Sequence, residues 1–372
     1  MAAVPTAVPT AGPTAVPTAM PVITIADDDP MMQLVRFALE GDRVLSEDWL
    51  RDYFSPEPVT ASDVTGIGRR CRLFGRCEVR YLSREEEPRL AELSRGSDAI
   101  VCRRAVIDAA VITASPSLRM INRLGERATG IDLVAARAAG VTVNCIARPT
   151  LAYTAEHAIL LMLAVGKALV EADKATRAGR YDRGKVHPID GVAYNWPGLA
   201  GLTGLYGKTL GIVGLGEVGT LVARRAAAFG MRLLYSKPNR LGEEQERRLG
   251  LGYRSFERLL EEADVVSLHA RAVPETRHLF DRAAFRRMKP GAIFVNTSRG
   301  SLVDEEALAA ALEGGWIAGA GIDNHAVEPR PAGDRLARLP NIVMTPHIAG
   351  GSRHALLEEV EQLIPRLEPA GG

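Results

Sequence analysis

The sequence predicts an α/β protein built from two doubly wound parallel sheets, and three observations lead to this fold class. Short apolar runs alternate with helix-like stretches along most of the chain. A glycine-rich turn follows directly after one apolar run in the second half. The length of 372 residues exceeds the roughly 150 of a typical domain, so two domains are expected.

The charge balance and hydropathy exclude several classes of function. The chain has 46 Lys and Arg against 45 Asp and Glu, a net charge of +1, so no general attraction to nucleic acid or anionic lipid is expected. Its longest apolar run, Ala158 to Gly166, is about half the roughly 20 residues that cross a bilayer. We therefore expect no nucleic-acid partner and no membrane span.

Cysteine use and the N-terminal segment indicate a cytoplasmic protein. The four cysteines show no C-x-x-C spacing, so neither a metal site nor a redox site is predicted. Residues 1–21 form a near-repeat of Ala-Val-Pro-Thr, in which the prolines prevent helix, and we expect a disordered tail. This segment lacks the basic start and the unbroken apolar core of a secretory signal.

The first predicted domain covers residues 22–150. Val22 to Ala26 resembles a strand, and a turn through Pro30 leads into a helix from Met31. Leu133 to Ala139 is helix-like and is stopped by Gly140. Further strands are expected at Ala99 to Cys102, Arg119 to Asn122 and Val141 to Cys145.

The second predicted domain covers residues 151–345 and binds a dinucleotide. One long helix is expected from Ala152 to Ala178, bridging the domains. The last helix, Arg353 to Leu367, would return to the first domain, to which we assign residues 346–372. Six strands are expected at Thr209 to Val213, Arg232 to Tyr235, Val265 to His269, Ala292 to Asn296, Ile317 to Ile322 and Ile342 to Thr345.

The glycine turn carries the strongest functional signal. It runs Gly214-Leu215-Gly216-Glu217-Val218-Gly219, between a strand and a helix from Thr220 to Phe229. Gly214 permits the tight turn, Gly216 lets the backbone approach phosphates, and Gly219 lets the helix pack on the strand. A pyrophosphate would then meet backbone amides at the helix N-terminus. The alternative is a glycine turn without a ligand.

The end of the next strand indicates which dinucleotide is bound. A site selective for NAD carries Asp or Glu there, but the sequence is Ser236-Lys237-Pro238-Asn239-Arg240. A hydroxyl and two cations suit a 2′-phosphate, so NADP(H) is predicted over NAD(H). The alternative is that Lys237 and Arg240 belong to a solvated loop.

Three polar residues follow strands of the second domain. They are Arg299, Glu328 and His347. A guanidinium can bind a carboxylate and polarise a carbonyl, a histidine can exchange a proton with an alcohol, and a carboxylate can orient that histidine. Taken singly, each residue could instead be a loop cation, a surface charge or a strand-end cap.

These segments together resemble the D-specific 2-hydroxyacid dehydrogenases, a family that includes 3-phosphoglycerate dehydrogenase and the glyoxylate and hydroxypyruvate reductases. The resemblance is strongest from about Gly207 to Gly351 and extends more weakly back to about Leu118. The motifs that carry it are Gly207 to Gly216, Met288-Lys289-Pro290-Gly291, Asn296 to Gly300 with Val303-Asp304, and Pro346-His347.

The resemblance implies a Rossmann NAD(P)-binding domain, a flavodoxin-like substrate domain and a homodimer. It implies that Arg299 binds the substrate carboxylate and carbonyl, that Glu328 supports the histidine, and that His347 is the acid/base. Asp323 would lie near the nicotinamide carboxamide. Thr276 and Thr297 are further expected cofactor contacts.

The sequence departs from the family at three positions. Arg127 replaces the second glycine of a loop that holds the substrate carboxylate, Arg271 replaces a proline, and His325 replaces an aromatic residue. One explanation is a larger or doubly anionic substrate that Arg103, Arg127 or Arg271 binds. The other is that these arginines face solvent or pair with neighbours.

The predicted activity is hydride transfer between a nicotinamide and a 2-oxo acid or D-2-hydroxy acid, in the reductive direction. One alternative is an NAD(P)H-sensing binding protein like the corepressors of this family, although such a scaffold has no need of Arg299, Glu328 and His347 together. Another is formate or phosphite oxidation. Formate enzymes have a glutamine in place of Glu328, so the carboxylate favours hydroxyacid chemistry.

Overall fold

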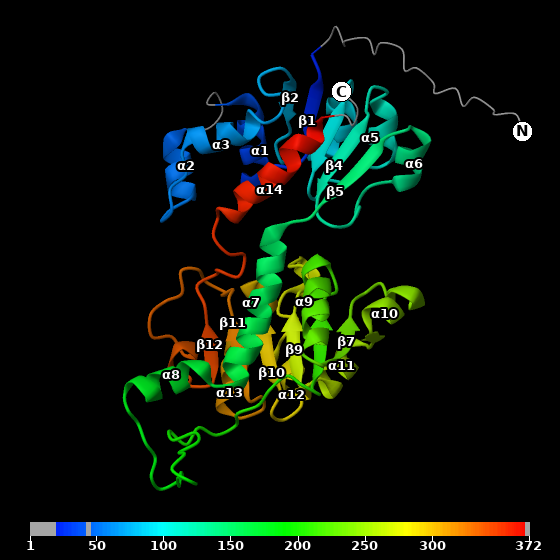
Figure 1. Cartoon of the computed structure of the whole chain (residues 1–372). Coiled ribbons are helices and arrows are strands. Elements are labelled where there is room, and N and C mark those ends of the chain that lie inside the picture. The colour runs from blue at the N-terminus through cyan, green and yellow to red at the C-terminus, as the bar shows by residue number, and fades with distance from the viewer. Residues whose placement is uncertain (1–19, 42–45, 369–372) are drawn as a thin grey trace, which may run out of the picture. The chain divides into compact units, whose positions relative to one another are not determined.

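The computed structural model describes residues 20–41 and 46–368 and divides the chain into two compact units (Figure 1). The first unit comprises residues 1–147 and 356–372, and the second comprises residues 148–355. The chain therefore returns to the first unit ten residues later than the expected boundary at 345/346, and His347 belongs to the second unit. Apart from its last two residues, the predicted tail of residues 1–21 lies outside the described residues.

The first unit contains a five-stranded parallel sheet in the order β2-β1-β3-β4-β5, which confirms the flavodoxin-like prediction. Strand β2 was not predicted, because its alternating sequence Glu-Val-Arg-Tyr lies at the sheet edge with no fully buried residue. The strands are β1 (Val22–Ile25), β2 (Glu78–Tyr81), β3 (Ala99–Cys102), β4 (Met120–Leu124) and β5 (Thr142–Ile146). The helices are α1 (Pro30–Glu40), α2 (Glu47–Tyr53), α3 (Ala61–Gly68), α4 (Leu90–Leu93), α5 (Ala109–Ala114), α6 (Leu133–Ala138) and α14 (Ala355–Leu363).

Helix α1 shows how local sequence fixes the elements of this unit. Asp29 is its N-cap and accepts hydrogen bonds from the amides of Met31 and Met32 at 3.0 and 3.2 Å. Pro30 occupies the first turn, where a missing N–H costs nothing. The apolar face of α1 is buried together with residues of α14, so the C-terminal helix completes this core.

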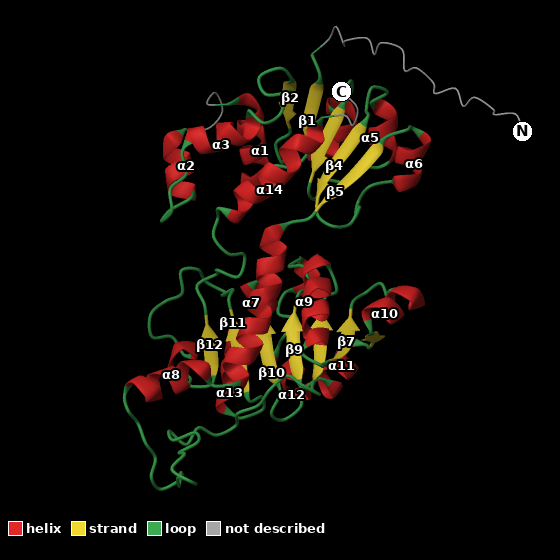
Figure 2. Ribbon diagram, viewed as in Figure 1, coloured by secondary structure: helices red, strands yellow, loops and turns green. Residues whose placement is uncertain are grey.

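The second unit contains a seven-stranded parallel sheet in the order β12-β11-β10-β9-β6-β7-β8 (Figure 2). All six predicted strands are present, and the unpredicted β8 adds an edge next to β7. The strands are β6 (Thr209–Val213), β7 (Arg232–Ser236), β8 (Leu251–Tyr253), β9 (Val265–Leu268), β10 (Ile293–Asn296), β11 (Gly319–Ile322) and β12 (Ile342–Met344). The helices are α7 (Pro149–Gly166), α8 (Leu169–Arg177), α9 (Glu217–Ala228), α10 (Glu243–Leu249), α11 (Phe256–Glu262), α12 (Arg282–Arg287) and α13 (Glu305–Glu313).

The single helix expected over residues 152–178 is wrong, because the structure has two helices there. Ala168 adopts a left-handed conformation with φ 46°, which ends the helical path between α7 and α8. Gly166 packs closely against Thr203, since an added Cβ would lie 3.2 Å from the Thr203 carbonyl oxygen. The break therefore falls where the chain must lie against the segment that leads into β6.

Helix α7 has the length and composition of a membrane span, with 18 residues and a mean hydropathy of 1.2. Its small and aliphatic residues, including Ala158, Leu161 and Met162, are buried in one core with α9 and the sheet. An added Cβ on Gly321 of β11 would lie 2.8 Å from Leu161 Cβ, which shows how closely the helix meets the strand. The buried face of α7 is thus accounted for by its position on this sheet.

The sheet of the second unit has a core on each face. One core holds α7 and α9, and the other holds α11, α12 and α13. Because every strand pair is parallel, the carboxyl ends of β6, β9, β10, β11 and β12 share one edge of the sheet. Loops leaving this edge carry most of the predicted site residues.

Candidate active site

The glycine turn joins β6 to α9 with close backbone contacts. The amide of Gly214 donates to the Ser236 carbonyl at 2.9 Å. Gly214 has φ +90°, and an added Cβ would lie 2.5 Å from the Ala270 nitrogen. An added Cβ on Gly219 would lie 2.4 Å from the Gly214 carbonyl oxygen. Both positions therefore require glycine for the turn itself.

Gly216 differs from its two neighbours because an added Cβ there would meet nothing within 4 Å. It is the N-cap of the 12-residue helix α9, so the turn presents backbone amides and open space together. At the end of β10, the buried hydroxyl of Thr297 has no hydrogen-bond partner in the described parts of the chain. These residues fit a dinucleotide, whose phosphates the amides of residues 216–219 would hold.

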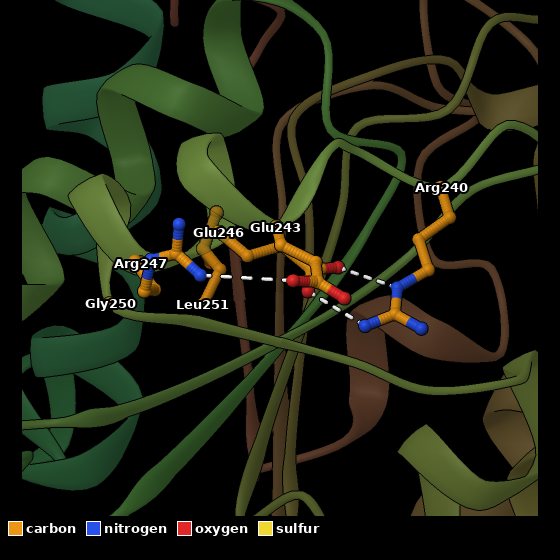
Figure 3. Close-up of a pocket in the computed structure, with 6 residues that line it drawn as sticks. All are labelled: Arg240, Glu243, Glu246, Arg247, Gly250 and Leu251. Carbon is orange, nitrogen blue, oxygen red and sulfur yellow. Dashed lines mark hydrogen bonds and ion pairs between the residues drawn. The ribbon is translucent and has the colours of Figure 1, made fainter.

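The end of β7 is more tightly organised than the sequence indicated. Arg240 binds Glu246 of α10 with two hydrogen bonds, Nε to Oε1 at 2.9 Å and Nη2 to Oε2 at 2.8 Å (Figure 3). The Tyr235 hydroxyl donates to Glu246 Oε1 at 2.7 Å. The Arg240 guanidinium also lies 5.5 Å from the ring centroid of Tyr253.

This ion pair changes the meaning of Arg240. Hydrogen bonds from Arg240 and Tyr235 lower the pKa of Glu246 to about 2, so the carboxylate stays charged. The adjoining pocket therefore contains charges of both signs rather than two unopposed cations. It is lined by Arg240, Glu243, Glu246, Arg247, Gly250 and Leu251 (Figure 3). Arg240 is thus neither a residue of a solvated loop nor a cation free of a neighbouring carboxylate. Ser236 and Lys237 lie at the end of the strand, as expected.

Two of the three predicted catalytic residues are in direct contact. His347 Nδ1 lies 2.7 Å from Glu328 Oε2, and the amide of His325 donates to Glu328 Oε1 at 2.9 Å. Burial raises the pKa of Glu328, but the His325 amide and the His347 ring outweigh it and hold that pKa below its usual value. Glu328 is therefore an anion that orients the His347 ring.

The backbone at His347 is held in an unusual conformation with φ 56°. Its amide donates to the Asp323 carbonyl at 2.9 Å, and the buried Asp323 carboxylate accepts from the amides of Ile348 and Ala349, both at 2.9 Å. The Thr345 hydroxyl donates to the same carboxylate at 2.6 Å. In the structure Asp323 therefore fixes the turn that carries His347. The sequence had led us to expect only that Asp323 lies near the nicotinamide carboxamide.

Arg299 follows β10 at the same edge of the sheet. Its side chain is exposed, and Nη1 donates to the Ser298 carbonyl at 2.7 Å. The next residue, Gly300, is pressed against the loop after β11, since an added Cβ would lie 2.1 Å from the His325 carbonyl. The loops that carry Arg299 and Glu328 are thus in contact through their backbones.

His325, which stands where the family has an aromatic residue, does not expose a polar group to solvent. The ring is buried, with Nε2 2.9 Å from the Thr345 carbonyl and Nδ1 3.0 Å from Arg330 Nη1. Because the carbonyl only accepts and the guanidinium only donates, the proton is assigned to Nε2. His157 of α7 lies 2.9 Å from the Thr345 hydroxyl, as expected of a packed, hydrogen-bonded histidine.

The remaining predicted residues are occupied locally or exposed. The Thr276 hydroxyl donates to the Arg271 carbonyl at 2.7 Å and caps its own turn, while the Arg271 side chain is exposed. In the first unit, Arg103 Nη1 donates to Asp29 at 2.9 Å, and Arg127 is partly buried after β4. For Arg103 the structure supports the alternative of pairing with a neighbour.

Two further residues lie near the predicted site, and sequence reasoning did not single out the second of them, Asn324. His269 at the end of β9 is hydrogen-bonded to the Ser267 hydroxyl at 2.8 Å, and burial lowers its pKa to about 4. Asn324, buried beside Asp323, lies between the Arg299 loop and the His347 ring. Its position directly after a buried strand was the available signal.

The structure therefore combines a Rossmann sheet and glycine turn with a histidine–carboxylate pair at one edge, which defines a nucleotide-dependent α/β oxidoreductase. The family model for the D-isomer specific 2-hydroxyacid dehydrogenase, NAD binding domain, matches residues 159–349. The chain belongs to the D-isomer specific 2-hydroxyacid dehydrogenase family. It is an NAD(P)-dependent oxidoreductase of 2-oxo acids and 2-hydroxy acids.

Individual relatives agree with this assignment. The chain is 41% identical over 263 residues to a glyoxylate reductase of Korarchaeum cryptofilum, covering 70% of this chain and 75% of that one. It is 37% identical over 279 residues to a D-3-phosphoglycerate dehydrogenase of Mycobacterium leprae, covering 75% of this chain and 50% of that one. The solved glyoxylate reductase from Paecilomyes thermophila matches 93% of each chain, with 27% identity and a TM-score of 0.53.

Proposed function

We propose that the protein reduces a 2-oxo acid to a D-2-hydroxy acid with NADPH. The observation that carries this proposal is the 2.7 Å contact between His347 and Glu328, at the sheet edge that also bears the glycine turn and Arg299. A structural histidine has no need of an ionised carboxylate on a turn with a left-handed backbone. An acid/base has that need, because the carboxylate fixes the ring and stabilises its charged form.

Each residue has a distinct task in this proposal. A bound nicotinamide cofactor supplies the hydride. Arg299 binds the carboxylate of the 2-oxo acid and polarises its carbonyl, which restricts the substrate to a reactive orientation. His347 donates the proton to the developing alkoxide through Nε2, because Nδ1 is held by Glu328. Glu328 remains an anion throughout and compensates the charge on the ring.

The preference for NADP(H) rests on the end of β7. No carboxylate occurs among residues 236–240, so nothing there repels a 2′-phosphate or holds a ribose 2′-hydroxyl as Asp or Glu would. Ser236 and Lys237 remain the proposed ligands, with Arg240 contributing from its ion pair with Glu246. The kcat/KM for NADPH and NADH should be compared; a tenfold or greater preference for NADH would refute this part.

The experiment that tests the activity is NADPH oxidation, followed by absorbance, against 2-oxo acids with one and two negative charges. His347→Ala should lower kcat at least about a hundredfold while the Kd for the cofactor is preserved. His187→Ala, which removes an exposed histidine of the loop before β6, is the matched control and should retain full turnover. Near-normal turnover of His347→Ala would remove that residue from the mechanism.

A cytoplasmic homodimer completes the proposal. The segment before β6 exposes apolar side chains to an unusual extent, with Tyr194 82%, Tyr206 88% and Ile189 75% exposed. A second copy that covers this segment would account for them, and light scattering of the full chain measures the mass. The four cysteines are free thiols, as suits a reducing compartment.

A further inference from the structure

The buried residue His325 is bonded to two parts of the candidate site. Its amide donates to Glu328 Oε1 at 2.9 Å, so its backbone holds the carboxylate that contacts His347. Its ring donates from Nε2 to the Thr345 carbonyl at 2.9 Å. Thr345 follows β12 directly and leads into the turn that carries His347. His325 therefore sets the position of Glu328 relative to that turn.

Arg330 holds the other side of the His325 ring. Its Nη1 donates to His325 Nδ1 at 3.0 Å and to Glu305 Oε1 at 3.1 Å. Its Nη2 lies 3.0 Å from Glu305 Oε2, and its Nε forms an ion pair with Asp334. The side chains of Arg330 and Glu305 are only 16% and 19% exposed, so solvent screens their charges little. Arg330 thus ties the His325 ring to the first residue of α13.

Glu305 also holds the backbone of the loop that carries Glu328. Its Oε1 accepts from the amide of Ala326 at 2.9 Å as well as from Arg330. Helix α13 contributes buried residues to the core on its face of the sheet, so this anchor is part of a packed element. The stretch 325–328 is thus fastened to α13 through one carboxylate and one guanidinium.

The turn that carries His347 has a support of its own. The Asp323 carboxylate accepts three hydrogen bonds from this turn, one from a hydroxyl and two from backbone amides. Loss of Arg330 would leave these bonds in place, but it would release the His325 ring on one side. Glu328 is therefore the site residue whose position depends on Arg330.

We infer that Arg330 is a positioning residue that holds Glu328 in contact with His347. It acts through the His325 ring, and the inference rests on the proposed function, in which Glu328 orients the acid/base. A phenylalanine at position 325 could fill the same space, but it could neither accept from Arg330 nor donate to the Thr345 carbonyl. Because catalytic groups must be held within about 0.5 Å of their working geometry, loss of Arg330 should lower turnover and leave binding unchanged.

The test compares two substitutions of Arg330 with a matched control. Arg330→Met keeps much of the length of the side chain and removes all of its donors. Arg330→Lys supplies an ammonium that can replace Nη1, because that single atom donates to both the histidine ring and the glutamate. Arg335→Met is the control, because Arg335 also pairs with glutamates of α13, Glu306 at 2.7 Å and Glu313 at 2.6 Å. Each substitution is made in the full native chain and in Glu328→Ala.

Turnover of a 2-oxo acid with NADPH should depend on Arg330 only while Glu328 is present. In the native background, kcat should fall about tenfold in Arg330→Met and stay within about threefold in Arg330→Lys and about twofold in Arg335→Met. The KM for the 2-oxo acid and the Kd for NADPH should change by less than about twofold in each variant. In Glu328→Ala, adding Arg330→Met should lower kcat by no more than about twofold, since the group that Arg330 positions is absent.

An equal loss of kcat in both backgrounds would overturn the inference, because a merely structural arginine does not depend on Glu328. Native turnover of Arg330→Met would also overturn it, as would a rise in KM or Kd in place of the fall in kcat. If circular dichroism shows Arg330→Met unfolded, Glu305→Gln replaces it, since glutamine still accepts from the Ala326 amide but lacks the charge that binds Arg330. Its loss of kcat should again be confined to the native background. Failure of the proposed function is distinct, because the native chain and Glu328→Ala would then turn over equally.

Discussion

The glycine turn permits a prediction that separates cofactor binding from stability. Gly219→Ala places a methyl group 2.4 Å from the Gly214 carbonyl oxygen, where only backbone could yield. Such overpacking costs about 1–3 kcal/mol. Since the second unit spans residues 148–355, its Tm should fall by about 2–12 °C.

Gly216→Ala should give the opposite result. The added methyl meets nothing within 4 Å, and φ −85° with ψ −153° suits any residue. Alanine is a poorer N-cap than glycine, which destabilises the helix, but it also restricts the unfolded chain, which stabilises the fold. Because these effects oppose each other, the free energy of unfolding should change by no more than about 1 kcal/mol. The methyl occupies the space in which phosphates would meet the amides, so the Kd for NADPH should rise at least about tenfold.

Thermal unfolding by circular dichroism and NADPH binding by fluorescence measure the two effects. Gly242→Ala is the matched control, because Gly242 is also an N-cap with an open Cβ position, on α10. Its Tm should change as little as that of Gly216→Ala, and its Kd should match the native value. The reasoning is refuted when Gly216→Ala binds NADPH normally, or when it unfolds as early as Gly219→Ala.

Three further predictions concern charge. Burial lowers the pKa of His269 from 6.5 to about 4. The free energy of unfolding should therefore decline by up to about 3 kcal/mol as pH falls from about 6.5 to about 4, and urea titrations of His269→Asn should show a smaller decline. An equal decline in the native chain and His269→Asn would contradict this prediction. Because the Glu246 pKa is lowered from 4.5 to about 2, the stability from its ion pair is present above pH 4.5 and lost toward pH 2. The Tm difference between the native chain and Glu246→Gln should therefore close over that range, and a constant difference would argue against the pair. Arg127→Gly should raise KM about tenfold for 2-oxo acids with two negative charges and leave monoanionic acids unaffected; an unchanged KM for every dianionic acid removes Arg127 from substrate binding.

The elements that the sequence predicted well were those with a strong local signal. Thr209 to Val213 is a fully buried strand bounded by glycine, and its predicted and observed limits coincide. Strand β8 was missed because it has three residues and a single fully buried one. The break at Ala168 was missed because the alanine favours helix, and packing of the neighbouring Gly166 on Thr203 opposes that preference.

The candidate site was predictable in its residue types and less so in its contacts. Arg299, Glu328 and His347 could be proposed as site residues because they follow strands, and strand ends of a parallel sheet share an edge. The pairing of Arg240 with Glu246 depends on how α10 packs beside β7, which no local pattern encodes.

The position of β12 has a consequence for how the protein matures. Among the described residues, this three-residue strand is the edge of its sheet, pairs with β11, and comes later in the sequence than the other strands. The glycine turn and β7 leave the ribosome long before the segment with Thr345 and His347. A growing chain therefore contains the glycine turn before it contains His347, the proposed proton donor.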